Sequence, residues 1–398
     1  MIAVEEALAQ ILARATPTPI ETVKLPEAHE RVLAQDIASR RTQPPMAVSA
    51  MDGYAVRAED AVLGARLSRV GEAPAGGSYD HPVGAGEAVR IFTGGPVPEG
   101  ADAIVLQEDV SVAADGAIVL GEAAIFGQHI RKAGVDFATG DVLLKAGRVL
   151  SPADVGLLAS MDWPDVPVRQ RPKVAILATG DELVLPGEPL GPNQIVSSNS
   201  FAIAALVNRS GGEAMDLGIA EDNIETIKEM ALRGKDADIF VTVGGASVGD
   251  HDLVQPALAE LGLDVDFWKI AMRPGKPLIF GGLADQAFIG LPGNPVSALV
   301  CATLYLAPMI RQMLGVTPAS IPTRQARLGR PLSDNKARQD YIRATLSLDD
   351  KGRDVVTPFD LQDSSVLSLF AHADVLIIRR PHAKPAEVGD IVEVLPLR

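Results

Sequence analysis

Four loops in the second half of the chain combine glycine with side chains that can bind anions or metal ions. They span residues 179–182, 244–252, 273–276 and 291–295 and read TGDE, GGASVGDHD, RPGK and LPGNP. Glycine lets backbone N–H groups approach and surround phosphate oxygens, so each loop could bind a phosphate. One such loop is more often an ordinary turn. Four of them meeting at one place would make a purely structural explanation improbable.

The charged residues of these loops indicate which ligand they would bind. Arg273 and Lys276 supply positive charge for an anion. The loops also hold hard oxygen donors, namely Asp181, Glu182, Asp250 and Asp252. Mg²⁺ prefers such donors and usually binds one or two carboxylates together with phosphate and water. The sequence therefore predicts a phosphorylated substrate and Mg²⁺, with Glu182, Asp250 and Asp252 as the metal ligands.

Several common kinds of active site are excluded. The sequence lacks the G-x-x-x-x-G-K-[ST] loop of P-loop NTPases and a strand-linked G-x-G-x-x-G. The single cysteine, Cys301, lies in an apolar stretch, which excludes a disulfide framework and a cysteine-built metal site. The six histidines have no zinc-ligand spacing, and only His251, inside a glycine-rich loop, is a candidate for lying near a ligand.

Two motifs in the first half carry further chemistry. Residues 49–56 (SAMDGYAV) place the carboxylate of Asp52 before a glycine, with no helical period around it. Residues 90–98 (RIFTGGPVP) leave a strand into a tight loop that holds the hydroxyl of Thr93. Glycine and proline also make turns with no function, so the residues alone leave a purely structural explanation open.

The elements that position the four loops alternate between strand and helix. Apolar runs at 173–179 and 238–243 predict buried strands, each followed by one of the loops. The predicted helices cover 200–209, 222–232, 252–262 and 296–314. Alternation of this kind predicts a doubly wound parallel sheet, in which ligands bind at the carboxyl ends of the strands.

The remaining segments have a different pattern. Residues 20–150 contain short β-type runs broken by Gly and Pro, Ser151-Pro152 predicts the start of a helix that ends near Ser160, and 318–398 return to β-type runs. The predicted divisions are a linker domain (1–46 and 140–170), an inserted β-rich domain (47–139), an α/β domain (171–316) and a β-barrel-like C-terminal domain (317–398).

Composition excludes two classes of partner. The 398 residues carry 51 acidic and 36 basic side chains, a net charge of −15, and only 4% of residues are aromatic. Binding of nucleic acid or of an anionic membrane needs clustered Lys and Arg, so neither is expected. Residues 286–310 carry no charge, but the Pro-Gly-Asn-Pro turn at 292–295 interrupts them. With no basic, apolar leader at its start, the chain is expected to be soluble and cytoplasmic.

The motifs together resemble the MoeA family, the molybdopterin molybdenumtransferases, which includes the E domain of gephyrin. The matching segments are SAMDGYAV (49–56), RIFTGGPVPEGADAIV (90–105), GVDF (134–137), TGDEL (179–183), SNS (198–200), GGASVGDHD (244–252), MRPGKP (272–277) and LPGNPVSA (291–298). They span nearly the whole chain and are highly specific in combination.

The resemblance implies an elongated, four-part subunit that forms a homodimer, with the insert of one subunit facing the α/β domain of the other. It implies a reaction in which adenylylated molybdopterin and molybdate react in the presence of Mg²⁺. The adenylate is hydrolysed, molybdenum remains on the dithiolene and AMP is released. The molybdopterin adenylyltransferase that makes the substrate is a further implied partner.

The resemblance also implies roles for individual residues. The catalytic set would be Asp52, Thr93, Asp136, Glu182, Asp222 and Asp252. The substrate-binding set would be Thr179, Gly180, Asp181, Ser198, Asn199, Gly244, Gly245, Ser247, Gly249, Arg273, Lys276, Pro292, Gly293, Asn294, Pro295, Arg343 and Ser364. The chain departs from the family pattern at Arg273, where Lys is frequent, at Ser197, where Asp is frequent, and at 362–365, where a Gly-containing motif is replaced.

Two other hypotheses compete with a metal-inserting enzyme. A non-catalytic paralogue that binds the pterin or serves as a scaffold should have lost residues such as Asp52, Asp222, Asp252 or Lys276, and all four are present. An adenylyltransferase acting on molybdopterin itself would not need the first 170 residues, so the motif at 49–56 argues against it.

Overall fold

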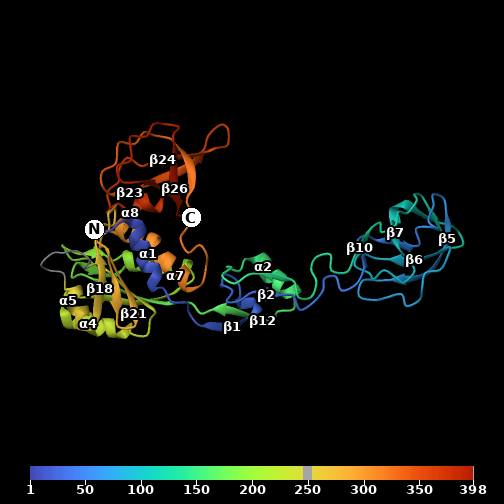
Figure 1. Ribbon diagram of the computed structural model, residues 1–398, viewed down its shortest axis with the longest axis horizontal. Coiled ribbons are helices and arrows are strands. Elements are labelled where there is room, and N and C mark those ends of the chain that lie inside the picture. Colours follow the sequence, from blue (N-terminus) through green and yellow to red (C-terminus); the bar gives the residue numbers. More distant parts are fainter. Residues whose placement is uncertain (245–252, 398) are drawn as a thin grey trace.

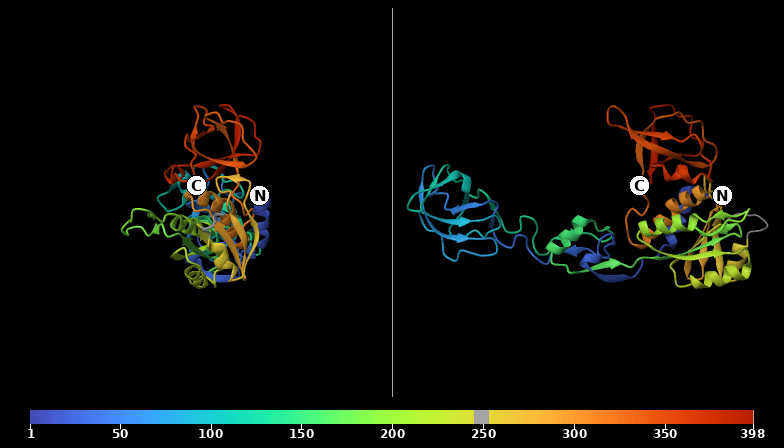
Figure 2. Two further views of the ribbon diagram at one scale, coloured as in Figure 1. Left: turned by 90° about the vertical axis from the view of Figure 1, so that its left-hand side faces the viewer. Right: turned by 180° about the vertical axis from the view of Figure 1, so that it is seen from behind.

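The chain is drawn out along one axis (Figure 1). The computed structural model describes residues 1–244 and 253–397. An α/β unit and a C-terminal β unit lie together at one end, a β-rich insert lies at the other, and a narrow linker joins them. The view from behind shows the same separation (Figure 2). The predicted elongated, multidomain α/β architecture is confirmed.

A six-stranded sheet forms the centre of the α/β unit. Its strands, in spatial order, are β16 (Glu213–Ala220), β13 (Lys173–Thr179), β17 (Ile239–Val243), β21 (Gln286–Leu291), β20 (Ile279–Leu283) and β18 (Leu263–Trp268). The first four are mutually parallel. Their carboxyl ends therefore lie along one edge, as the strand and helix pattern predicted.

The other edge of this sheet differs from the predicted all-parallel arrangement. Strand β20 runs antiparallel to both β21 and β18. Only Ala284 and Asp285 separate β20 from β21, and Ala284 has a positive φ of 51°. Two residues can close a hairpin but cannot cross a sheet to start a parallel strand, which fixes the reversal. The sheet is thus mixed.

Helices cover both faces of the sheet. They are α3 (Asn199–Arg209), α6 (Pro295–Cys301), the π-type turn η3 (Ala302–Leu306) and α7 (Ala307–Met313) on one face, and α4 (Ile224–Arg233) and α5 (Val254–Ala259) on the other. Val174 and Ile176 of β13 pack into the first cluster, whereas Ala175 and Leu177 pack into the second. This alternation explains the continuous apolar run of the strand.

The long helix from Pro295 to Met313 is apolar enough to cross a membrane by length and composition alone. However, 78% of its most apolar window is buried inside the protein, which is how the core helix of a folded domain behaves. Cys301 lies on this helix and is fully buried, as predicted.

The N-terminal helix α1 (Val4–Arg14) packs on the α/β unit. Val4, Ala7 and Ile11 are buried in the same cluster as the central sheet. The first fifteen residues thus lie apart from the rest of the segment 1–46 that the sequence groups with the linker. The domain boundaries themselves stay a prediction.

The insert is a six-stranded β unit. In spatial order its strands are β7 (Ala103–Leu106), β4 (Gly53–Val56), β6 (Glu87–Ile91), β5 (Arg66–Ala73), β9 (Ile118–Leu120) and β8 (Val110–Val112), with the short turn η2 (Gln107–Asp109) after β7. Gly53 of β4 packs against its neighbour so closely that a Cβ would lie 2.0 Å from the carbonyl oxygen of Val105. Only glycine fits there, which fixes the residue that follows Asp52.

The linker consists of paired short strands. The pairs are β1 (Ile20–Lys24) with β12 (Asp165–Arg169), β2 (Ile37–Ala38) with β11 (Val142–Leu144) and β3 (Val48–Ser49) with β10 (Ile130–Arg131), all antiparallel. The 3-10 turn η1 (Leu25–Glu27) and helix α2 (Pro152–Ser160) pack beside them. Ser151 caps α2 in a capping box with Asp154, as predicted.

The C-terminal unit closes into a ring. Strands β23 (Gln339–Leu348), β24 (Asp354–Pro358), β22 (Arg324–Leu328), β26 (Ile391–Pro396) and β25 (Val375–Arg379) pair in that order, and β25 pairs back with β23. A five-residue helix, α8 (Leu367–Ala371), lies beside them. One further strand, β19 (Met272–Arg273), comes from the α/β segment and pairs with the start of β23. This pairing joins the two units.

Candidate functional site

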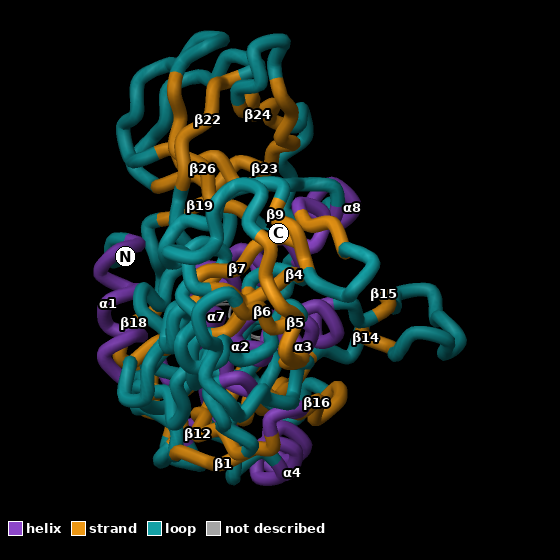
Figure 3. The backbone as a smooth tube through the Cα atoms, turned by 90° about the vertical axis from the view of Figure 1, so that its right-hand side faces the viewer, coloured by secondary structure: helices purple, strands orange, loops and turns teal. Residues whose placement is uncertain are grey.

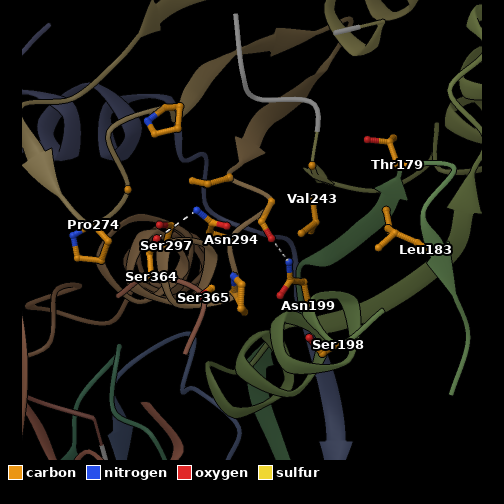
Figure 4. A pocket seen from close by; sticks show the side chains of 18 of the residues that line it. Thr179, Leu183, Ser198, Asn199, Val243, Pro274, Asn294, Ser297, Ser364 and Ser365 are labelled. Atoms are coloured by element: carbon orange, nitrogen blue, oxygen red, sulfur yellow. Dashed lines mark hydrogen bonds between the residues drawn. The ribbon is translucent and has the colours of Figure 1, made fainter. Parts of the chain in front are cut away.

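A cavity of about 950 Å³ lies where the carboxyl ends of the parallel strands meet the C-terminal unit. Strands β13, β17 and β21 end at its wall with Thr179, Val243 and Leu291, of which the first two line it. Figure 4 shows Thr179 and Val243 on one side and Pro274, Ser297 and Ser364 on the other. The volume lies at the upper end of the usual range for small-molecule sites.

Most of the predicted substrate-binding residues line this cavity. They are Thr179, Gly180, Ser198, Asn199, Gly244, Arg273, Lys276, Pro292, Gly293, Asn294, Pro295 and Ser364, and from the predicted catalytic set Glu182 and Asp222 line it as well. The predicted Gly245, Ser247, Gly249, Asp250 and Asp252, together with His251, lie outside the described residues. The convergence predicted for the glycine-rich loops is therefore present for the parts that are described.

One end of the cavity is acidic. Glu182 and Asp222 line it, while Asp181 lines an adjoining hollow. The Oδ1 atom of Asp181 accepts a 2.9 Å hydrogen bond from the backbone N–H of Asp222, which fixes the backbone there. Partial burial, followed by the negative charges of Asp181 and Glu182, raises the pKa of Asp222. A cation at this end would relieve that repulsion.

Helix α4 begins in a way that leaves Asp222 free. The motif at 222–225 has capping-box spacing, but the side chain that caps the helix is Asn223, whose Oδ1 accepts hydrogen bonds from the N–H groups of Glu225 and Thr226. Asp222 lies one residue before the cap, so its carboxylate has no capping role and remains available to the cavity.

Thr179 at the end of β13 has an unused hydrogen-bonding group. It is only 5% exposed, and its Oγ1 atom has no hydrogen-bond partner among the described residues. A buried hydroxyl without a partner costs free energy. A polar ligand in the cavity would satisfy it.

The other end of the cavity is basic. Lys276 is exposed and has no ion pair within the described residues. Arg273 forms a salt bridge with Asp340, which is only 7% exposed. Gly275 between them has a φ of 99°, and a Cβ there would lie 2.4 Å from the Sγ atom of Cys301. The loop can therefore turn so tightly only with glycine at this position.

Two hydrogen bonds connect the loops across the middle of the cavity (Figure 4). The side-chain amide of Asn199 donates to the carbonyl oxygen of Gly293 at 2.7 Å, and that of Asn294 donates to Oγ of Ser364 at 3.1 Å. The backbone N–H of Val296 also donates to the carbonyl of Ser364. Ser364 belongs to the segment 362–365, where the chain departs from the family motif. It nevertheless lies at the cavity and contacts the Pro-Gly-Asn-Pro turn.

Arg343 lies behind the cavity wall rather than on it. Its side chain is 1% exposed, and its guanidinium donates to the side chain of Gln362 and to the carbonyls of Leu361 and Val366. It therefore holds the loop that carries Ser364. A different arginine of the C-terminal unit, Arg338, lines the cavity, and sequence reasoning missed it.

The strands that bound the mouth of the cavity project from the body of the molecule. They are β14 (Leu183–Val184) and β15 (Ile195–Val196), which pair in parallel. Figure 3 shows this loop extending outward beside α3. Leu183, Ile195 and Val196 line the cavity, so the projecting segment contributes its apolar wall.

Asp52 and Thr93 lie in the insert, at the far end of the molecule from the cavity (Figure 1). The Oδ1 atom of Asp52 accepts hydrogen bonds from the backbone N–H of Thr93 at 2.7 Å and from its hydroxyl at 2.8 Å. These two bonds, with a smaller contribution from the charge of Arg90, lower the pKa of Asp52. The carboxylate is therefore ionised at neutral pH.

Asp136 is exposed on the linker, next to the buried Phe137. Its backbone N–H donates to the carbonyl of Gln43. Neither this residue nor Asp52 and Thr93 lines the cavity of the same chain. The predicted catalytic set is thus divided between two distant regions of the chain.

The described residues contain no group of three Asp, Glu, His or Cys side chains placed to hold a metal ion. The cavity nevertheless offers two carboxylates, those of Glu182 and Asp222. Mg²⁺ commonly takes only one or two protein carboxylates and completes its shell with phosphate and water. Partial burial and, to a smaller extent, the charges of Asp181 and Glu182 raise the pKa of Asp222, and a cation between Glu182 and Asp222 would offset both effects.

Comparison with known proteins matches almost the whole chain to one family. The "MoeA N-terminal region (domain I and II)" matches residues 2–161, a "Probable molybdopterin binding domain" matches 175–312, and the "MoeA C-terminal region (domain IV)" matches 325–397. The chain is similar to the molybdopterin molybdenumtransferase of Haemophilus influenzae, with 36% identity over 100% of this chain and 98% of the relative. That of Bacillus subtilis is 33% identical over 100% and 94%.

A solved structure gives the same result for the fold. The crystal structure of the molybdopterin biosynthesis MoeA protein from Pyrococcus horikosii matches with a TM-score of 0.85 and 32% identity, covering 100% of this chain and 99% of that one. Sequence, domain order and fold agree along the full length. The chain belongs to the molybdopterin molybdenumtransferase (MoeA) family.

Proposed function

We propose that this protein inserts molybdenum from molybdate into adenylylated molybdopterin and releases AMP, as a cytoplasmic step of molybdenum cofactor biosynthesis. The observation that carries the proposal is the cavity with one acidic and one basic end, in a chain that belongs to this family. A substrate that brings both a phosphate chain and an oxyanion needs cations, and a divalent metal beside the phosphates needs carboxylates.

The basic end suits the anionic parts of the substrates. Lys276 is free to approach a phosphate or molybdate oxygen, while Arg273 is oriented by Asp340. The guanidinium still offers donors that Asp340 does not use, because a guanidinium carries five. Positive charge here would offset the negative charge that develops on the phosphoryl group during hydrolysis.

The acidic end suits Mg²⁺. Glu182 and Asp222 would hold the ion, with the predicted Asp250 and Asp252 beyond the described residues as further ligands. When bound, the metal would neutralise phosphate charge and polarise the scissile phosphoanhydride. The part played by this chain is to fix the donors, and the hydrogen bond from the N–H of Asp222 to Asp181 does so on one side.

The reaction is a hydrolysis that releases the nucleotide. Water attacks the phosphorus of the AMP unit and loses a proton to solvent. The bond from that phosphorus to the bridging oxygen breaks, and the molybdopterin phosphate leaves with the electron pair of that bond. The hydroxyl of Thr179, which has no hydrogen-bond partner within residues 1–244 and 253–397, is available to hold a polar group of the substrate at the strand end. The two dithiolene thiols then form two Mo–S bonds with molybdate, one Mo–O bond breaks, and that oxygen leaves as water with the two thiol protons.

The distant residues suggest that the working enzyme is a homodimer. Asp52 and Thr93 are preassembled at the far end of the elongated chain, outside the cavity of their own chain. We propose that they meet the cavity of a second copy, with Asp136 on the linker nearby. The molybdopterin adenylyltransferase that makes the substrate is a proposed partner for its delivery.

The direct test is turnover by the purified protein. Incubation with adenylylated molybdopterin, molybdate and Mg²⁺ should yield AMP and active cofactor, and removal of Mg²⁺ with a chelator should stop both. Lys276→Ala should impair the reaction, whereas Lys235→Ala, an exposed lysine of the same unit outside the cavity, should not. Tight binding of the substrate without AMP release would instead identify a non-catalytic pterin-binding paralogue.

A further inference from the structure

Arg90 of strand β6 is a basic side chain of the insert whose contacts have no part in the proposed function. Its Nη1 atom donates hydrogen bonds to the carbonyl oxygens of Gly53 at 2.8 Å and of Ile91 at 3.3 Å. Its Nη2 atom donates to the side-chain oxygen of Gln107. These oxygens belong to three segments, namely β4, β6 and the turn η2. A guanidinium carries five donors in a fixed plane, so this one side chain can hold the three segments together.

These contacts adjoin the Asp52–Thr93 pair. Gly53, whose carbonyl Arg90 binds, directly follows Asp52 in the chain. The backbone N–H of Gln107 donates to the carbonyl oxygen of Asp52 at 3.2 Å, while its side chain accepts from Arg90. Thr93 lies three residues after Arg90, just beyond the end of β6. Arg90 therefore connects the backbone that carries the carboxylate with the backbone that carries the hydroxyl.

Two aromatic rings lie against the guanidinium of Arg90. Its Cζ atom is 4.6 Å from the ring centre of Phe92 and 5.3 Å from that of Tyr54. Tyr54 is the residue opposite Arg90 in the antiparallel pairing of β4 with β6, and it is only 7% exposed. Both distances lie within the range in which a cation is attracted to an aromatic ring. The rings and the three hydrogen bonds together hold the charged group in one place.

The positive charge of Arg90 also acts on Asp52. Arg90 forms no salt bridge with any side chain of residues 1–244 and 253–397, so no carboxylate there cancels its charge. After the two hydrogen bonds from Thr93, that charge is a further and smaller cause that lowers the pKa of Asp52. The carboxylates of the turn η2, those of Glu108 and Asp109, contribute no shift. Loss of the positive charge would therefore raise the pKa of Asp52.

We propose that Arg90 is a positioning residue for the reaction, which fixes the backbone around the Asp52–Thr93 pair and places a positive charge beside it. This inference rests on the proposed function, in which the pair meets the substrate in the cavity of a second copy. The pair lies at the far end of the chain from its own cavity (Figure 1). Loss of Arg90 should therefore lower the rate of turnover without weakening the binding of molybdate or nucleotide.

Substitution of Arg90 in the full-length protein tests the proposal. Arg90→Met keeps an apolar stem but removes the charge and the donors, so AMP release should fall about tenfold, the scale of one charge-assisted hydrogen bond. Calorimetric titration with molybdate and with AMP should match the wild type. The pKa of Asp52, followed by carbon-13 NMR, should rise. Arg90→Lys restores the charge and should recover part of both losses. Arg69→Met, which removes an exposed arginine of the same insert that pairs with Glu72, is the control and should behave as the wild type does.

A double-mutant cycle shows whether Arg90 acts through Asp52. In an Asp52→Asn background, Arg90→Met should cost little further activity, because the group that Arg90 positions is already lost. An equal loss in both backgrounds, an unchanged pKa of Asp52 in Arg90→Met, or the same loss in Arg69→Met would overturn the inference. A wild-type protein that releases no AMP would overturn the proposed function and with it the role in turnover, whereas the NMR titration would still decide whether Arg90 acts on the pair. Thermal melting of Arg90→Lys checks that the fold is kept.

Discussion

Two regions of the molecule carry carboxylates of the predicted site, and they shift the pKa of those carboxylates in opposite directions. In the insert, two hydrogen bonds from Thr93 lower the pKa of Asp52. At the acidic end of the cavity, partial burial and the neighbouring Asp181 and Glu182 raise the pKa of Asp222. The surroundings of Asp52 favour its ionised form, whereas those of Asp222 disfavour it.

The difference indicates how each region could work. Asp52 and Thr93 are joined by their own two hydrogen bonds, without any part of the chain outside the insert. The cavity is assembled from loops of two units and is complete only with its ligands. If both belong to one active site, the Asp52–Thr93 pair of one subunit would have to meet the cavity of another when the dimer forms. The following predictions test this contrast, starting with the largest expected effect.

Removal of the preformed carboxylate should have the largest consequence. We expect Asp52→Ala to lower the rate of AMP release by about a hundredfold or more, the scale of a lost catalytic acid or base. The melting temperature should change little, because Asp52 lies on the surface turn and its partner Thr93 is exposed. Asp115→Ala, an exposed aspartate of the same insert, is the control and should retain full activity. Normal turnover by Asp52→Ala would show that Asp52 takes no part in the active site.

Mixing of subunits tests whether the two regions act across a dimer. An Asp52→Ala chain and a Lys276→Ala chain should each be nearly inactive alone. After exchange, about a quarter of the wild-type activity should return, because half of the dimers are mixed and each of these holds one intact site. Differently tagged chains must first demonstrate the exchange. Verified mixed dimers without recovered activity would place both residues in one subunit's site.

Variants at the acidic end and at the basic end of the cavity should respond differently to titration with Mg²⁺. Asp222→Asn removes one carboxylate, so the Mg²⁺ concentration for half-maximal AMP release should rise by about tenfold, the scale of one charge-assisted contact. Lys276→Ala should leave that concentration nearly unchanged and instead weaken binding of molybdate or nucleotide. Equal shifts of the Mg²⁺ curve in both variants would contradict the division into two ends.

The smallest expected effect is on the pKa of Asp52 itself. Thr93→Ala removes the hydroxyl donor but leaves the backbone donor, so the pKa of Asp52 should rise part of the way to its usual value of about 3.8. A carboxylate whose pKa is lowered on folding stabilises the folded state above its unfolded pKa and loses that contribution as pH falls through the folded pKa. The stability difference between wild type and Thr93→Ala should therefore be present at pH 7 and shrink below about pH 4. Carbon-13 NMR titration of the Asp52 carboxyl gives the pKa, and no change would show that the backbone N–H dominates.

Sequence patterns predicted the position of a residue best where that position follows from the strand directly before it. The carboxyl ends of β13, β17 and β21 lie together because these strands are parallel, and this was predictable from the apolar runs. The reversal at β20 was also visible in principle, because only two residues separate that strand from β21. The capping of α4 by Asn223 rather than Asp222 depends on a one-residue difference that the spacing could not resolve.

The contributions of the C-terminal unit could not be predicted in the same way. Arg338 enters the cavity because β19 pairs with β23, a contact between segments more than sixty residues apart that no local pattern reports. Arg343, five residues later, has the same chemistry but points into the wall, where it binds the loop at 361–366. Both are arginines near one strand, and only the packing of the barrel on the α/β unit decides which of them faces the cavity.

The pairing of β3 with β10 has a practical consequence for protein engineering. Residues 50–129 leave and return through neighbouring backbone positions, since Ser49 pairs with Ile130 and Val48 with Arg131. Antiparallel strands at this separation can be joined by a two-residue hairpin, so the whole lobe can be excised with a single splice. The shortened polypeptide would keep the cavity and lose Asp52 and Thr93, so ligand binding by the cavity can be measured with and without the insert.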